Sequence, residues 1–217
     1  MADSDVAPRR ADRLRQLVSR DRCALLILEM QRGVVGPGSG LPELAAAGAQ
    51  VGLIEHVATV AHAARRRGVS VLHCTAETLP GGLGRSHNAR LFAAALKAGM
   101  DNAPGSDEVQ PVQAIGPEAG DIVFPRYHGL SPLNGSGLDQ ILRNSGITTV
   151  VVVGVSLNVA IPNLVFDAVN LSYQVVVVSD AVVGVPLEYG AQVLENTLSL
   201  VATLVTSDEL VQTWESA

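Results

Sequence analysis

The sequence predicts a single three-layer α/β/α domain with a six-stranded, mostly parallel sheet. Six short aliphatic runs alternate with longer segments of helical periodicity, which is typical of βαβ units. Two of these runs, residues 149–154 and 174–179, each contain four consecutive valines, as expected for strands covered by helices on both faces. A length of 217 residues fits one domain, and the 47% apolar content excludes a disordered chain.

The chain divides into a short arm and one folded unit. Residues 1–21 are charged and hold few apolar groups, which predicts a flexible arm running into a short helix, and the domain is expected over residues 22–217. The expected strands are residues 24–28, 69–73, 122–124, 149–154, 174–179 and 203–206. The expected helices are residues 51–67, 89–98, 137–145, 158–170 and 187–201.

Several of these helices have recognisable ends. In residues 51–67 apolar side chains recur every three or four positions, so one face is expected to pack on the sheet. Gly68 follows three arginines at the end of that helix, and Gly146 closes the helix over residues 137–145 in the same way. Ser136 is the expected N-cap of this second helix.

Charge and composition exclude several classes of partner. Fifteen Lys and Arg against 21 Asp and Glu give a net charge of −6, so a nucleic-acid partner is not expected. The apolar runs are too short to span a membrane, and the first residues do not resemble a signal peptide, so a cytoplasmic location is expected. The two cysteines, Cys23 and Cys74, form no disulfide framework and are expected to be buried thiols.

Two long polar segments are candidates for shaping a binding site. Residues 75–90 and 99–120 are rich in Gly, Pro, Ser and Asn, and they are longer than simple connectors. Such loops often carry the residues that contact a ligand.

Polar residues follow the expected strands at their carboxyl ends, where ligands bind in open parallel sheets. Glu29 follows the first strand and Arg126 follows the third, with Tyr127 and His128 directly after it, while His73 ends the second strand. A guanidinium beside a carboxylate offers a charge partner. The alternatives are a solvent-exposed capping Glu, an ordinary surface Arg and structural histidines.

The turn after the fourth strand is a second candidate. Residues 154–162 lead from a strand into a helix, and the amides of such a turn stabilise anions and oxyanions. Ser156 and Asn158 lie in this turn, and together with Gln31 after the first strand they complete the polar rim that we expect to bind a substrate.

The chain resembles the isochorismatase-like hydrolase superfamily, which includes cysteine hydrolases such as nicotinamidases, carbamoyl amidases and ureido-acid hydrolases. The segments that carry the resemblance are residues 25–31, 120–126, 131–139, 154–168 and 179–181, in the order of the family. The resemblance spans about residues 23–210 and implies the Rossmann-like fold of the superfamily.

At all three catalytic positions of the family the sequence departs from the usual Asp, Lys and Cys. The resemblance places Glu29 at the Asp position, Arg126 at the Lys position and Ala160 at the Cys position. Alanine has no lone pair with which to attack a carbonyl, so a covalent thioester route through residue 160 is excluded. Cys74 is the alternative thiol, but it lacks the helix-terminal setting that lowers the pKa of a reactive cysteine.

Two functions follow from the resemblance. The first is hydrolysis of a small polar metabolite, an amide, a ureide or a vinyl ether, with Glu29 as general acid or base and Arg126 as a fixed cation. The second is a catalytically inactive relative that binds a small ligand or serves as an assembly subunit. No cofactor is expected. No metal is expected either, because Glu43 is the only carboxylate over residues 36–44, where nicotinamidases carry their metal ligands.

The resemblance also implies self-association, as a homodimer or larger homo-oligomer, with the helix over residues 158–170 as the candidate contact.

The last expectation concerns the polar rim at the carboxyl ends of the strands. We expect Glu29 and Arg126 to form a close charge pair, because burying either group alone costs several kcal/mol. Such a pair favours a base or anchoring role for Glu29 over proton donation.

Overall fold

The computed structural model describes residues 6–97 and 102–216, and these contain one six-stranded parallel sheet. Its strands are β1 (Cys23–Leu28), β2 (Ser70–Ala76), β3 (Ile122–Arg126), β4 (Thr149–Val155), β5 (Gln174–Val183) and β6 (Thr203–Val205). They lie in the order β3-β2-β1-β4-β5-β6, and each neighbouring pair is parallel. The predicted fold class is confirmed.

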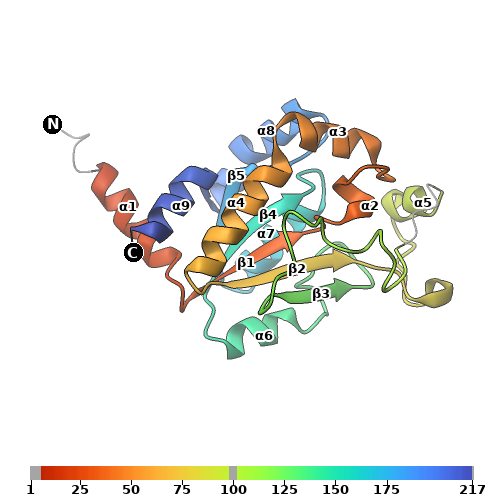
Figure 1. Cartoon of the computed structure of the whole chain (residues 1–217), viewed down its shortest axis with the longest axis horizontal. Coiled ribbons are helices and arrows are strands. Elements are labelled where there is room, and N and C mark those ends of the chain that lie inside the picture. Colours follow the sequence, from red (N-terminus) through yellow and green to blue (C-terminus); the bar gives the residue numbers. More distant parts are fainter. Residues whose placement is uncertain (1–5, 98–101, 217) are drawn as a thin grey trace.

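Both faces of the sheet are covered by helices. On one face α4 (Leu53–Arg66) and α9 (Ser207–Glu215) pack with α1 (Val6–Leu17) and α3 (Pro42–Gln50), and on the other face lie α6 (Leu138–Asn144) and α7 (Ala160–Asn170) (Figure 1). The remaining elements are α2 (Arg32–Val35), α5 (Arg90–Lys97), α8 (Leu187–Asn196) and two 3₁₀ turns, η1 (Pro80–Gly82) and η2 (Leu198–Leu200).

The central strand β1 divides its side chains between two apolar cores. Cys23, Leu25 and Ile27 pack toward α4, while Ala24, Leu26 and Leu28 pack toward α7. All six residues are buried, because side chains alternate between the faces of a strand and both faces are covered here. The central strands are therefore held from both sides up to the edge at which they end.

The strand order creates a switch point between β1 and β4. From β1 the chain builds the sheet outward to β2 and β3, and it then returns to place β4 on the other side of β1. In such sheets a crevice opens at the carboxyl ends of the two strands. Figure 1 shows the strand arrows pointing toward the end of the molecule where α2, α3 and α5 lie.

The five expected helices are present with shifted ends. The helix expected over residues 187–201 stops at Asn196 and is followed by η2, while residue 98 of another lies outside the described residues. The strand expected to end at His73 continues to Ala76, because Cys74, Thr75 and Ala76 pair with residues 124–126 of β3.

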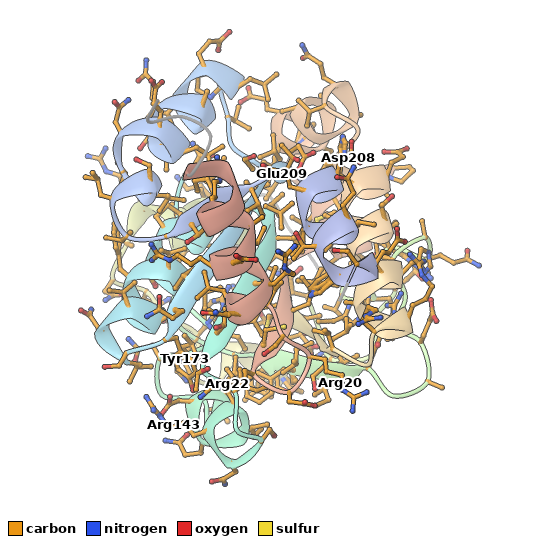
Figure 2. The ribbon with its side chains drawn as sticks, turned by 90° about the vertical axis from the view of Figure 1, so that its left-hand side faces the viewer. Arg20, Arg22, Arg143, Tyr173, Asp208 and Glu209 are labelled. Carbon is orange, nitrogen blue, oxygen red and sulfur yellow. The ribbon has the colours of Figure 1, made fainter. Side chains whose placement is uncertain are left out.

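Three helices were not expected from the sequence, namely α2, α3 and α9. The start of α9 carries a recognisable signal, a capping box in which the Thr206 hydroxyl accepts from the Glu209 amide and the Glu209 carboxylate accepts from the Thr206 amide. Asp208 and Glu209 lie in the first turn (Figure 2), where carboxylates are favoured by the helix dipole.

At the amino end of β5, polar side chains of α6 contact the residue that precedes the strand, Tyr173. Arg143 and Tyr173 lie near each other (Figure 2), with the guanidinium over the ring, 5.0 Å from its centroid. Arg143 also donates to the Asp139 carboxylate at 2.9 Å. The Tyr173 hydroxyl donates to the same carboxylate at 2.9 Å. These bonds tie α6 to the start of β5.

No single helix among the described residues has the length and apolarity to cross a membrane. The helices α3 and α4 reach that threshold only when they are taken together, and they are bent by 68° relative to each other.

Gly154 supplies the first test of the fold. It has φ +107° and lies against β1, where an added Cβ would stand 2.2 Å from the Leu28 carbonyl oxygen. Gly154→Ala is expected to lower the free energy of unfolding by about 3 kcal/mol or more, since the strain of a positive φ adds to overpacking. The matched control is Gly68→Ala, with φ +70° and open space around the new methyl group. Its expected loss is about 1 kcal/mol. Equal losses in urea denaturation would contradict the close approach of β1 and β4.

Candidate active site

Glu29 is the first residue after β1, and its backbone leaves the strand in the left-handed region, with φ +51°. Its amide donates to the Cys74 carbonyl at 2.9 Å, which still ties it to β2. The side chain is 21% exposed. A non-glycine residue in this conformation costs about 1–3 kcal/mol, and such residues cluster at functional sites.

Arg126 ends β3 and lies within reach of Glu29 across β2. Its Nη2 donates to Glu29 Oε1, and its Nη1 donates to the carbonyl oxygens of Gly129 and, at 3.4 Å, His128. The guanidinium side chain is 12% exposed. The predicted charge pair is therefore confirmed, and its cation is engaged by one carboxylate and two carbonyls.

A cavity of about 580 Å³ opens beside this pair at the carboxyl edge of the sheet. The expected site residues that line it are Glu29, Arg126, Tyr127, His128, Ser156, Asn158 and Ala160. The two long polar segments contribute residues 76–78, 85, 86 and 102, as expected for loops that shape a site. Apolar walls come from α5, through Leu91, Phe92, Ala94 and Ala95, and from Leu41, Pro42 and Leu44 at the start of α3.

The turn into α7 and the first residue of that helix line this cavity. Ala160 is its first residue, and the amides of Leu157, Val159 and Ile161 are bonded to carbonyls of Val183 or Ser156. Within the described residues the amides of Asn158 and Ala160 have no protein acceptor. Free amides at the start of a helix are suited to an anion or a developing oxyanion.

The side chain of Asn158 is already engaged. Its amide nitrogen donates to the Val185 carbonyl at 2.6 Å, and its amide oxygen accepts from the Val185 backbone at 2.8 Å. Asn158 therefore fixes the turn after β5 against the start of α7, although it also lines the cavity.

Gln31 was expected to contact substrate, and the structure gives it a different role. It is 1% exposed and does not line the cavity. Its side-chain nitrogen donates to the carbonyls of Ala76 and Val109, and its oxygen accepts from the Ala76 amide at 2.8 Å. These three hydrogen bonds hold the end of β2 against the segment around Val109.

His73 was also expected at the substrate, and it lies away from the cavity. It is 1% exposed in β2, and its Nε2 lies 3.0 Å from Asp121. Burial lowers the pKa of His73, while its contact with Asp121 opposes the shift. Burial would raise the pKa of Asp121, but hydrogen bonds from Arg65, the Glu118 amide and His73 together hold it below its usual range.

Neither cysteine lines the described cavity. Cys74 is 3% exposed and packs in the apolar core on the α7 side, and burial raises the pKa of its thiol to about 12. Cys23 donates to the Val18 carbonyl, and burial raises its pKa to about 12 as well. Both thiols are therefore protonated at neutral pH, which makes them poor nucleophiles.

Sequence reasoning did not single out two charged residues that line the cavity, Glu77 and Arg85. The Glu77 carboxylate accepts from the Thr75 hydroxyl at 2.9 Å, and Arg85 Nη2 donates to the Thr78 hydroxyl at 3.1 Å. Both lie in the segment over residues 75–90. The Gly-, Pro-, Ser- and Asn-rich composition of this segment predicted that it shapes a site, but it did not indicate which of its residues line the cavity.

The described residues contain no group of three or more His, Cys, Asp or Glu arranged to hold a metal ion.

These observations define a class of protein, an open parallel α/β fold with an acid, a cation and a helix start around one cavity at the switch point. Residues 23–209 match the family model of the isochorismatase domain. The chain belongs to the isochorismatase family.

Similar proteins include ureidoacrylate amidohydrolases. The chain is 31% identical over 178 residues to the ureidoacrylate amidohydrolase RutB of Methylorubrum extorquens, covering 74% of this chain and 69% of the relative. It spans only 30–32% of the length of three further RutB proteins, from Methylobacterium radiotolerans and two Pseudomonas strains.

Solved structures share the fold. A cysteine hydrolase from Pseudomonas syringae pv. phaseolicola 1448A superposes with a TM-score of 0.80 at 19% identity, covering 92% of this chain and 95% of the other. The N-carbamoylsarcosine amidase of Thermoplasma acidophilum gives a TM-score of 0.67 at 26% identity, covering 86% and 97%.

The thiols provide a test of the site. Because both cysteines are buried with a raised pKa, the native protein is expected to release no chromophore from Ellman's reagent at pH 8, and the unfolded chain is expected to react twice. Ala160→Cys is expected to add one fast-reacting thiol, since it would place sulfur at a helix start beside the cavity. A wild-type thiol that reacts in the native state would contradict this account of Cys74 and Cys23.

Proposed function

We propose that this chain hydrolyses a small polar amide or ureide in the cavity beside Glu29, without a cysteine nucleophile. The observation that carries the proposal is the Glu29–Arg126 pair, which lies in one cavity with the start of α7 in a member of the isochorismatase family. The ureidoacrylate amidohydrolases and the N-carbamoylsarcosine amidase support an amide or ureide over a vinyl ether.

Because Ala160 offers no nucleophile, the proposed reaction begins with direct attack of water on the substrate. The oxygen of the water molecule bonds to the substrate carbonyl carbon, and Glu29 accepts a proton from that water. The backbone amides of Asn158 and Ala160 stabilise the oxyanion that forms on the substrate. When the oxyanion collapses, the carbon–nitrogen bond breaks and the leaving nitrogen takes the proton from Glu29. Arg126 keeps its proton throughout and holds the carboxylate in place.

The cavity suits a small metabolite. A volume of about 580 Å³ lies within the range of ligand sites, about 300–1,000 Å³, and the walls from α3 and α5 are apolar. Apolar walls lower the local dielectric constant and so strengthen the interactions of the polar groups beside them.

The second candidate function is ligand binding or assembly without turnover. Two observations favour it: residue 160 has no nucleophile, and the cation of the cavity, Arg126, is already engaged by Glu29 and two carbonyls. A screen of small amides, ureides and isochorismate with purified protein separates the two functions. Binding of a compound without product formation would support the second function and refute the first.

Glu29→Gln tests the proposed base. The amide is similar in size but cannot accept the proton from water, so turnover is expected to fall about 10²- to 10⁴-fold. Glu55→Gln makes the same change on an exposed part of α4 outside the cavity lining, and it is expected to retain full activity. Full activity of Glu29→Gln on any substrate would refute the role given to Glu29.

We also propose that the chain self-associates through α7. This helix exposes Phe166 and Val169, which are 41% and 37% exposed in the single chain. Sedimentation at micromolar concentration is expected to show a species larger than 22.6 kDa, and Phe166→Glu is expected to dissociate it. Ile141→Glu on α6, where Ile141 is 40% exposed, is the matched control and should leave the species intact. A single 22.6 kDa species for the wild type would refute the proposal.

A further inference from the structure

Two guanidinium groups line the cavity, and their surroundings differ. Arg126 is bonded to the Glu29 carboxylate and to two backbone carbonyls. The guanidinium of Arg85 has one hydrogen-bond partner among the described residues, the neutral hydroxyl of Thr78 at 3.1 Å, and it forms no ion pair with any of them. A guanidinium carries five N–H donors, so most of the donors of Arg85 are available to a ligand.

The chain holds Arg85 in place by its local backbone. The preceding turn contains Gly81, Gly82 and Gly84, all with φ between +70° and +77°, and the Arg85 amide donates to the Gly82 carbonyl at 3.1 Å. The next residue, Ser86, accepts from the Gly129 amide at 2.9 Å, which ties this turn to the segment that follows Arg126. Arg85 is half-buried, so its charge is partly removed from water, and the described residues supply it with no counter-ion.

A cation in this setting favours an anionic ligand. Charge-assisted bonds from a guanidinium fork to a carboxylate are among the strongest hydrogen bonds in proteins, and they fix the orientation of the bound group. We infer that Arg85 binds a carboxylate of the substrate and thereby selects a carboxylate-bearing amide or ureide. This inference deepens the proposed function and rests on the cavity beside Glu29 being the site of binding.

A second charged residue, Glu77, favours a ligand that carries a carboxylate at one end and N–H groups at the other. Glu77 also lines the cavity, accepts one bond from the Thr75 hydroxyl and forms no ion pair with the described residues. Its free acceptors suit the N–H groups of an amide or ureide. The third carboxylate of the lining, Glu43, is exposed on α3. A plain anion would meet Glu77 unfavourably, whereas a ureido acid offers a carboxylate for Arg85 and N–H donors for Glu77.

The experiment compares N-carbamoylglycine with its methyl ester, which differ in the carboxylate charge. Initial rates are measured where the wild type hydrolyses the probe, and dissociation constants are measured by calorimetry where it does not. The wild type is expected to prefer the acid at least tenfold. Arg85→Gln is expected to lower kcat/KM or affinity for the acid about 10- to 100-fold, mainly through KM, and to leave the ester unchanged. Arg85→Lys keeps the charge but loses the fork, so its loss should be smaller.

The matched control is Arg90→Gln, which removes an exposed arginine at the start of α5 outside the cavity lining. It is expected to leave both probes unchanged. A wild type without preference for the acid, or an Arg85→Gln variant that keeps the preference, would overturn the inference. Acid-selective binding without any hydrolysis would support the role of Arg85 and count against the proposed function, so the two failures are distinguishable.

Discussion

The ion pair between Glu29 and Arg126 connects the ends of β1 and β3 across the strand that separates them. Its geometry depends on the parallel register of three strands, because a shift of one residue would turn either side chain to the other face. Burying one of these charges alone would cost several kcal/mol, and each charge offsets the desolvation cost of the other. The left-handed turn at Glu29 and the bonds from Arg126 to the next segment meet at this contact, on the rim of the cavity.

The alignment proposed from the resemblance places Glu29, Arg126 and Ala160 at the usual acid, lysine and cysteine positions, and the three replacements that it implies are chemically consistent with one another. An arginine offers a fork where a lysine offers a point charge, and the fork here holds one carboxylate and two carbonyls at once. Glutamate reaches one methylene further than aspartate. With alanine at the start of α7, the helix contributes its backbone amides but no side-chain nucleophile.

Much of the fold was predictable from the sequence, and so was the ion pair, because valine-rich strands and their polar ends are local signals. His73 was misplaced because β2 continues three residues beyond its expected end, which moves the carboxyl edge from His73 to Ala76. Gln31 follows a strand but turns inward to satisfy backbone groups of two other segments. Arg85 follows a turn rich in positive φ angles and Glu77 follows the end of β2, and no periodic pattern reveals that their side chains line the cavity.

The burial of both sulfur atoms has a consequence for the conditions under which the site survives. A catalytic thiolate is open to peroxide, which converts it through sulfenic acid to sulfinic acid, and the second step is generally irreversible. At residue 160 this protein offers such oxidants no target, and its two thiols are protonated and enclosed in apolar surroundings. Oxidative stress that silences a cysteine hydrolase would leave the polar groups of this cavity chemically intact.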